Sequence, residues 1–171
     1  MSTRDDILDA FETLIIEQGE RAATLARVAE QAGISKGGLL YHFGSKEAMV
    51  DGLAERFSQH SANDAERLRT LDDPIAVFLQ ESLAIKNPGD RTFVALAGLA
   101  QLDEYPGAKQ ALSDFDDMAM DALTDVLGDA ALAQLVLRLS DGFYLRAALG
   151  LDEGDTVDIE PLMAHLRKLL P

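Results

Sequence analysis

The sequence predicts an all-α protein of about nine helices and no strands, with one domain over residues 1–46 and a second over residues 47–171. Apolar residues recur every three or four positions along most of the chain, which is the spacing of one buried helix face. No segment alternates apolar and polar residues for long, as a half-buried strand would. Capping residues and Gly or Pro dipeptides separate the periodic stretches, which sets the number of helices.

The first predicted helix carries an apolar stripe made of Ile7, Leu8, Phe11, Leu14 and Ile15. Gly19 ends it, because glycine adopts the left-handed conformation found at helix C-termini. A second, shorter helix is expected from Thr24 to Ala32. Thr24 is its N-cap, with a hydroxyl that accepts an otherwise unpaired backbone N–H.

The third predicted helix runs from about Lys36 to Phe43 and follows a tight turn. Gly33 permits the turn, and Ser35 caps the new helix. Leu39 and Phe43, four residues apart, are expected to point inward. Ser45 caps a fourth helix that extends to Leu68 or Leu71.

The remaining helices are delimited by turn signals. We expect them at Asp73-Pro74 to Ile85, residues 91–102, Pro106-Gly107 to Leu127, residues 130–149, and Pro161 to Leu170. The stretch 91–102 is apolar on nearly every face, as in a helix buried at a domain centre. Asn87-Pro88-Gly89-Asp90 is predicted to be a turn, and residues 151–155 an acidic loop.

Composition excludes several classes of function. The chain of 171 residues is 47% apolar and has no cysteine, so it is long enough to bury a core but cannot form disulfides or thiolate metal sites. No signal-peptide stretch opens it, and its longest apolar run is far short of the roughly 20 residues of a membrane span. We therefore expect a cytoplasmic protein with no membrane partner. No metal-ligand spacing, phosphate loop or nucleophile motif occurs, so neither cofactor nor enzymatic activity is expected.

The net charge of −15 argues against a nucleic-acid partner when it is averaged over the whole surface. The charge is uneven along the sequence. Residues 1–70 carry eight basic and twelve acidic side chains, whereas residues 71–171 carry seven and eighteen. Because salt screens charges beyond about 8–10 Å, DNA responds to the local potential.

Residues 24–46 form the most informative segment. Two short helices joined by a three- or four-residue turn with a glycine make a helix-turn-helix, whose second helix can enter the major groove of DNA. The pattern alone is unspecific, because helical hairpins are common.

The sequence from Ala32 to Glu47, AGISKGGLLYHFGSKE, resembles the signature of the TetR family of bacterial regulators. The shared features are the Ala-Gly-Ile-Ser turn, the aromatic end Tyr41-His42-Phe43, and Ser45-Lys46-Glu47 opening the fourth helix. The resemblance covers residues 4–57 in helix length and order. It implies a three-helix, helix-turn-helix DNA-binding domain followed by a helical ligand-binding and dimerisation domain.

The resemblance also implies which residues contact double-stranded DNA. They are Thr24, Ser35, Lys36, Gly37, Gly38, Leu40, Tyr41, His42 and Lys46. Gly38 and Leu40 depart from the commoner family pattern, in which polar residues stand there. Paired glycines inside a helix cost roughly 1 kcal/mol each relative to alanine. Either the bare backbone approaches the groove closely, or the first turn frays and folds on DNA.

In this family the second domain encloses an effector cavity and pairs two subunits. The candidate cavity residues are Phe78, Phe93, Leu96, Leu99, Phe115, Met118 and Phe143, for which core packing is the alternative. We expect a small, largely apolar effector; a cation is the alternative if Asp114 or Asp141 faces the cavity. The acidic residues of 114–125 otherwise form a solvated face.

The candidate dimerisation residues lie in the last two long helices and are Leu132, Leu135, Val136, Leu139, Leu162 and Leu166. An apolar stripe of this kind requires cover, which a second copy provides. We expect a homodimer on a palindromic operator, acting as a repressor that an effector releases through the fourth helix. The alternative is a helical interaction protein of the same fold that has lost specific DNA binding.

Overall fold

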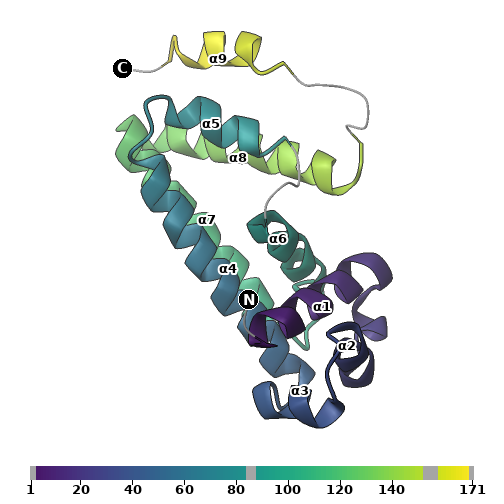
Figure 1. Ribbon diagram of the computed structural model, residues 1–171. Helices are drawn as coiled ribbons and strands as arrows, with labels where there is room; N and C mark the ends of the chain where they lie inside the picture. The colour runs from purple at the N-terminus through teal and green to yellow at the C-terminus, as the bar shows by residue number, and fades with distance from the viewer. Residues whose placement is uncertain (1–2, 84–87, 152–157, 170–171) are drawn as a thin grey trace. The chain divides into compact units, whose positions relative to one another are not determined.

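Nine α-helices and one short 3-10 helix make up the described part of the computed structural model, which comprises residues 3–83, 88–151 and 158–169 (Figure 1). No strand occurs in these ranges, in agreement with the predicted fold class. The elements are α1 (Thr3–Gln18), η1 (Glu20–Ala22), α2 (Leu25–Gln31), α3 (Lys36–His42), α4 (Lys46–Leu68), α5 (Pro74–Glu81), α6 (Pro88–Leu99), α7 (Pro106–Leu127), α8 (Ala130–Ala148) and α9 (Glu160–Leu166).

The chain folds into two units, and α4 and α7 each pass from one into the other. The first unit comprises Met1–His60 and Pro88–Asp114, and the second comprises Ser61–Asn87 and Phe115–Pro171. The predicted domain boundary, between residues 46 and 47, falls in the first turn of α4. That boundary stays a prediction.

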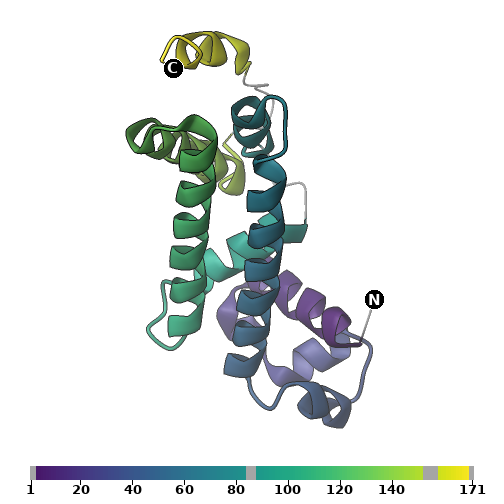
Figure 2. The ribbon, with the colours of Figure 1, turned by 90° about the vertical axis from the view of Figure 1, so that its left-hand side faces the viewer.

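The first unit is built around α1, which packs against α2 and α6, while α2 packs against α3. Figure 2 shows α1, α2 and α3 gathered beside the first turns of α4. Fully buried large side chains from all these helices except α2 form the core: Ile7, Leu8, Phe11, Leu14, Leu39, Met49, Leu53, Leu96 and Leu99. The predicted stripe of α1 is therefore confirmed, because all five of its residues are buried.

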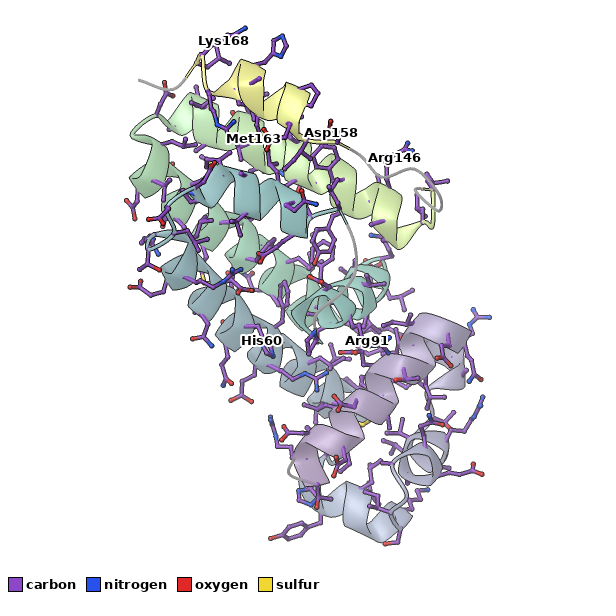
Figure 3. All side chains as sticks on the ribbon, turned by 45° about the horizontal axis from the view of Figure 1, so that its top comes forward. His60, Arg91, Arg146, Asp158, Met163 and Lys168 are labelled. Atoms are coloured by element: carbon purple, nitrogen blue, oxygen red, sulfur yellow. The ribbon has the colours of Figure 1, made fainter. Side chains whose placement is uncertain are left out.

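The second unit has a separate core in which α5 packs on α8. Its fully buried side chains include Leu79 of α5, Leu123 of α7 and Leu137 of α8. Met163 brings α9 into the same core (Figure 3). The Ser82 and Ser140 hydroxyls lie 2.7 Å apart inside it, so these two buried hydroxyls are hydrogen-bonded to each other.

Several predicted helix boundaries need correction. Pro88, Gly89 and Asp90 are not a turn but the first turn of α6, because proline is accepted at the first helical position and an acidic residue favours a helix N-terminus. Leu102 lies beyond the end of α6 and is exposed. The last helix begins at Glu160, one residue before the predicted start. Asn87, Ile85, Leu170 and residues 152–155 lie outside the described part of the chain.

Candidate nucleic-acid interface

The helix-turn-helix is held together by backbone and cap hydrogen bonds. Gly33 has a φ of 69°, a left-handed conformation that glycine adopts without steric cost. The Ile34 amide then donates to the Ala29 carbonyl at 2.9 Å, which closes the turn after α2. Both predicted caps are confirmed: the Thr24 hydroxyl accepts from the Arg27 amide at 3.3 Å, and the Ser35 hydroxyl accepts from the Gly38 amide at 3.0 Å.

Helix α3 has one buried face and one exposed face. Leu39 and, just past the helix end, Phe43 are buried as predicted. The opposite face exposes Lys36, Leu40, Tyr41 and His42, and 86% of the Tyr41 surface is accessible. A phenol this exposed adds nothing to the core, so the fold does not account for an aromatic residue at this position.

The two glycines of α3 are not required by packing. A Cβ atom at Gly37 would lie 3.9 Å from the Ser35 hydroxyl oxygen, and one at Gly38 would lie 3.4 Å from it, both ordinary van der Waals distances. Neither residue has a positive φ. The helix thus carries two destabilising residues for which its own structure gives no reason.

The helix-turn-helix is locally basic although the chain is acidic. Residues 24–46 contain Arg27, Lys36 and Lys46 against the single acidic residue Glu30. Lys36 and Arg27 are exposed, and α3 itself has no acidic residue. This local balance partly offsets the objection raised by the net charge of −15.

Lys46 is bound by the protein itself. Its ammonium nitrogen donates to the Glu20 carboxylate at 2.7 Å and to the Glu20 carbonyl at 3.0 Å. The Tyr105 hydroxyl donates to the same carboxylate oxygen at 2.8 Å. These hydrogen bonds, Lys46 first, lower the pKa of Glu20, and burial together with Glu20 raises the pKa of Tyr105. Sequence reasoning placed Lys46 at a phosphate and missed Glu20, which lies 26 positions away.

A buried carboxylate of α1 accepts hydrogen bonds from α4 and α6 of the first unit. Glu12 is only 4% exposed and accepts from Arg56 of α4 at 2.6 Å and from the Thr92 hydroxyl of α6 at 2.7 Å. Arg91, labelled in Figure 3, donates to its other oxygen at 3.1 Å. Asp9 also pairs with Arg56. No sequence signal predicts this network, because nothing in an apolar stripe marks one glutamate as inward.

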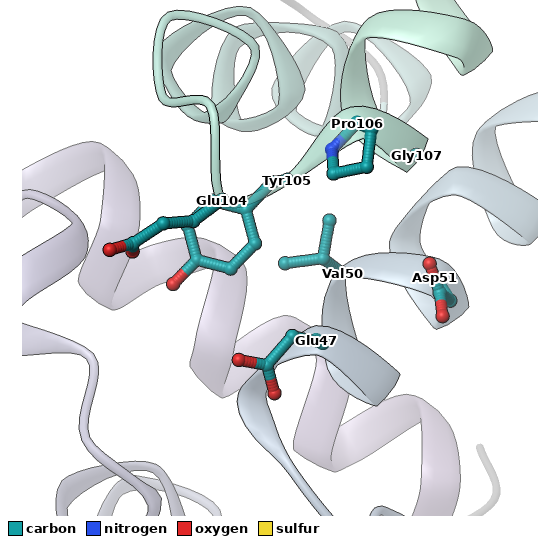
Figure 4. Close-up of a pocket in the computed structure, with 7 residues that line it drawn as sticks. All are labelled: Glu47, Val50, Asp51, Glu104, Tyr105, Pro106 and Gly107. Atoms are coloured by element: carbon teal, nitrogen blue, oxygen red, sulfur yellow. The ribbon is translucent and has the colours of Figure 1, made fainter.

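A hollow of about 250 Å³ lies in the first unit between the start of α4 and the start of α7 (Figure 4). It is lined by Glu47, Val50, Asp51, Glu104, Tyr105, Pro106 and Gly107. Three of these residues are acidic and none is basic, so the hollow disfavours anions. None was predicted from sequence.

The predicted effector residues are divided between the two units. Phe93, Leu96 and Leu99 belong to the first, where Leu96 and Leu99 are fully buried. Phe78, Phe115 and Phe143 pack, partly buried, against the second core, and Met118 is also partly buried. Their role in binding an effector stays a prediction.

The predicted dimerisation residues differ in burial, and their role in pairing stays a prediction. Leu132, Val136 and Leu166 are buried in the second unit's own core. Leu139 and Leu162 are partly buried, and Leu135 alone is exposed. Sequence periodicity identified an apolar stripe but could not tell which core it fills.

The acidic stretch of α7 faces solvent for the most part. Asp114, Asp117, Asp121 and Asp125 are exposed, and Asp125 pairs with Arg69 at 2.9 Å. Asp141 of α8, a candidate carboxylate facing the effector cavity, pairs with Arg138. Burial raises the pKa of Asp141 despite that arginine.

The described residues offer neither a metal site nor a membrane span. Among them, no three His, Asp or Glu side chains are grouped so that they could hold a metal ion. In the same part of the chain, none of the helices combines the length and the apolar character needed to cross a membrane.

Two short helices joined by a glycine turn, the second exposed along one face and supported by a three-helix scaffold, define the helix-turn-helix class of DNA-binding proteins. Residues 7–53 match the family model described as bacterial regulatory proteins, tetR family. Residues 7–53 are thus similar to the DNA-binding domain of TetR family transcriptional regulators.

Curated relatives match only part of this chain. The HTH-type transcriptional repressor KstR2 of Rhodococcus jostii is 46% identical over 54 residues, which cover 32% of this chain and 26% of that protein. The HTH-type transcriptional regulator AlkX of Mycobacterium tuberculosis is 32% identical over 92 residues, which cover 54% of this chain and 41% of that protein. The matches thus span less than half of the length of these relatives.

Solved structures resemble the whole chain in fold. A TetR family member from Streptomyces coelicolor A3 gives a TM-score of 0.76 at 20% identity and covers 100% of this chain and 99% of its own. GusR of Salmonella enterica gives a TM-score of 0.73 at 17% identity and covers 98% of this chain and 95% of its own. Identities this low show the fold alone.

Proposed function

We propose that this protein represses transcription by inserting α3 into the major groove of a specific DNA site. The observation that carries the proposal is the division of α3 into a buried face, with Leu39, and an exposed surface that includes Lys36 and Tyr41. A recognition helix needs this arrangement, because its inner face fixes its position while its outer face meets base edges and phosphates. Repression is proposed because KstR2, which is 46% identical over 54 residues, bears the name of a repressor.

Each exposed residue of α3 suits a different contact. Lys36 reaches either a guanine edge or a phosphate, and Tyr41 donates its hydroxyl proton to a phosphate. Leu40 offers only apolar contact, such as with a thymine methyl group. The N-termini of α2 and α3, capped by Thr24 and Ser35, add backbone amides for phosphates.

The proposal is tested by selecting duplexes from a random pool with the purified chain and measuring affinity for the selected site at two salt concentrations. Lys36→Met is expected to weaken specific binding by about tenfold, because one good base or phosphate contact is worth about 1–3 kcal/mol. Lys109→Met, which removes an equally exposed lysine from α7, serves as control and leaves affinity unchanged. If no duplex is enriched, the protein is not a sequence-specific regulator.

We further propose that two copies pair through the exposed leucines of α8 and the residues after it: Leu135, Leu145, Leu149 and Leu151. Four exposed leucines along one helix and its C-terminal end form an apolar surface that requires cover. A second copy covers it by two-fold symmetry, and two recognition helices then read a palindromic site. Leu145→Glu combined with Leu149→Glu should produce monomers in sedimentation equilibrium. Should the wild-type protein itself sediment as a monomer at micromolar concentration, the dimer is refuted.

The effector is proposed to be a small, largely apolar molecule that lowers affinity for DNA. Phe78, Phe115 and Phe143 supply apolar, partly buried surface in the second unit. A cationic effector is disfavoured at Asp141, because Arg138 already compensates that carboxylate. Thermal shifts with matched neutral and cationic aromatic compounds test this choice, and larger shifts with the cations would reverse it.

A second candidate function is a helical interaction protein that no longer binds DNA specifically. The net charge of −15 and the apolar residue Leu40 on the outer face of α3 favour it. Salt dependence separates the two functions, because specific DNA binding weakens as salt rises.

A further inference from the structure

Lys46 is one of the residues that the TetR resemblance places in contact with DNA, yet its charge is already engaged within the protein. It occupies the first turn of α4, four residues after the end of α3. Lysines and helix N-termini are among the groups that bind DNA phosphates. In the structure, however, the ammonium group donates to the side chain and to the backbone carbonyl of Glu20. Two of its three N–H groups are therefore used within the protein.

Glu20 is well suited to hold this lysine. The two side chains are 20% and 21% exposed, so solvent screens their attraction less than it screens an open surface pair. The Tyr105 hydroxyl donates to the carboxylate oxygen that binds Lys46, which anchors the acceptor to the segment before α7. The lowered pKa of Glu20 keeps the carboxylate charged at neutral pH.

We propose that Glu20 is a positioning residue that competes with DNA phosphate for Lys46. In free protein the ammonium group lies on Glu20, and on DNA it moves to a phosphate while Glu20 keeps its hydrogen bond from Tyr105. The inference rests on the proposed DNA-binding function. It adds that an acidic residue of the protein itself lowers the affinity of Lys46 for the phosphate backbone of DNA.

The competition has a signature in ion release. A free lysine that binds a phosphate releases about one condensed cation, which adds about 0.9 to the slope of log affinity against log salt. When Lys46 leaves Glu20, the carboxylate is left as an unpaired negative charge close to the duplex. The net charge that the Lys46 and Glu20 pair brings to the phosphate is then close to zero, so Lys46 contributes almost nothing to the slope of the wild-type protein.

Four full-length proteins test this on the selected duplex between 50 and 200 mM salt: wild type, Glu20→Gln, Lys46→Met and the double variant. Glu20→Gln should steepen the slope by about 0.9, which is about a 3.5-fold greater loss of affinity over that range. Lys46→Met should leave the wild-type slope unchanged, and the double variant should return to it. Glu30→Gln, which removes an exposed carboxylate from α2, is the control for charge alone.

The outcomes separate the inference from the function it rests on. No specific binding by the wild-type protein overturns the regulatory function itself. Specific binding with equal slopes for Glu20→Gln and Glu30→Gln overturns the competition only. Should Glu20→Gln not fold, the comparison of wild type with Lys46→Met can still overturn the competition, because a freely available Lys46 predicts a slope smaller by about 0.9 in that variant.

Discussion

Replacing Gly37 and Gly38 by alanine separates the stability of α3 from its function. The structure has room for both methyl groups, with the Ser35 hydroxyl oxygen as the nearest neighbour at 3.9 and 3.4 Å. Each substitution removes backbone freedom from the unfolded chain and should stabilise the protein by about 0.5–1 kcal/mol. For a chain of this length, the double variant should raise the melting temperature by about 2–8 °C.

The same double substitution should lower the affinity for DNA if the bare backbone of α3 lies against the duplex. Two methyl groups at such a contact would push the helix outward and weaken the contacts of its neighbours. Loss of a single hydrogen-bonded contact, about 1.4 kcal/mol, already lowers affinity tenfold. We therefore expect a protein that is more stable than the wild type and binds the selected duplex at least about tenfold more weakly.

Denaturant unfolding and fluorescence anisotropy measure the two quantities on the same samples. Gly98→Ala is the matched control, because Gly98 lies exposed in α6 and an added Cβ there would meet no atom within 4 Å, so the change should stabilise without altering affinity. A double variant that is both more stable and tighter on DNA would show instead that the first turn of α3 folds on binding. Unchanged affinity would refute both interpretations of the glycine pair.

Three other substitutions address the scaffold. Glu12→Gln should destabilise the protein by about 2 kcal/mol in denaturant unfolding, because it removes the buried charge that accepts from Arg56 and Arg91, while Asp9 still pairs with Arg56. Glu17→Gln on the exposed face of α1 should change stability by less than about 0.5 kcal/mol. Gly33→Ala should cost about 1 kcal/mol despite the open space around it, since φ is positive there; a neutral result would contradict the left-handed turn. Glu20→Gln should be less stable than wild type at pH 7. The difference should begin to shrink near the ordinary glutamate pKa of about 4.3 and disappear only as pH falls through the lowered pKa of Glu20 in the folded protein, because the carboxylate stabilises the fold only while it is charged. A difference that does not shrink at all as pH falls from about 7 to about 2 would exclude the ion pair as its cause.

Local sequence signals predicted the helix-turn-helix well because its determinants are local. The caps Thr24 and Ser35 satisfy amides three residues ahead, and Gly33 sets one backbone angle. The buried positions Leu39 and Phe43 follow from helical spacing alone. Each of these choices is fixed within one or two helical turns, so the sequence contains all the information needed.

The same reasoning failed where the partner is distant in sequence. Periodicity marks Leu132 and Val136 as apolar but does not say whether their own core or a second copy covers them. Glu20 meets Lys46 and Tyr105 across 26 and 85 positions, which no local pattern encodes. The turn expected at Pro88 failed for another reason: proline is compatible with both a turn and the first position of a helix.

The acidity of the chain and its proposed affinity for DNA are compatible because much of the charge around the helix-turn-helix is paired internally. In the first unit Arg4 pairs with Glu55, Lys46 with Glu20, and Arg56 with Glu12. These pairs remove cations from contact with phosphate, and they neutralise carboxylates that would repel it. What remains on α3 is one lysine and no acidic residue. Such a surface gains little from non-specific attraction, so its affinity depends on groove contacts that only the right sequence supplies.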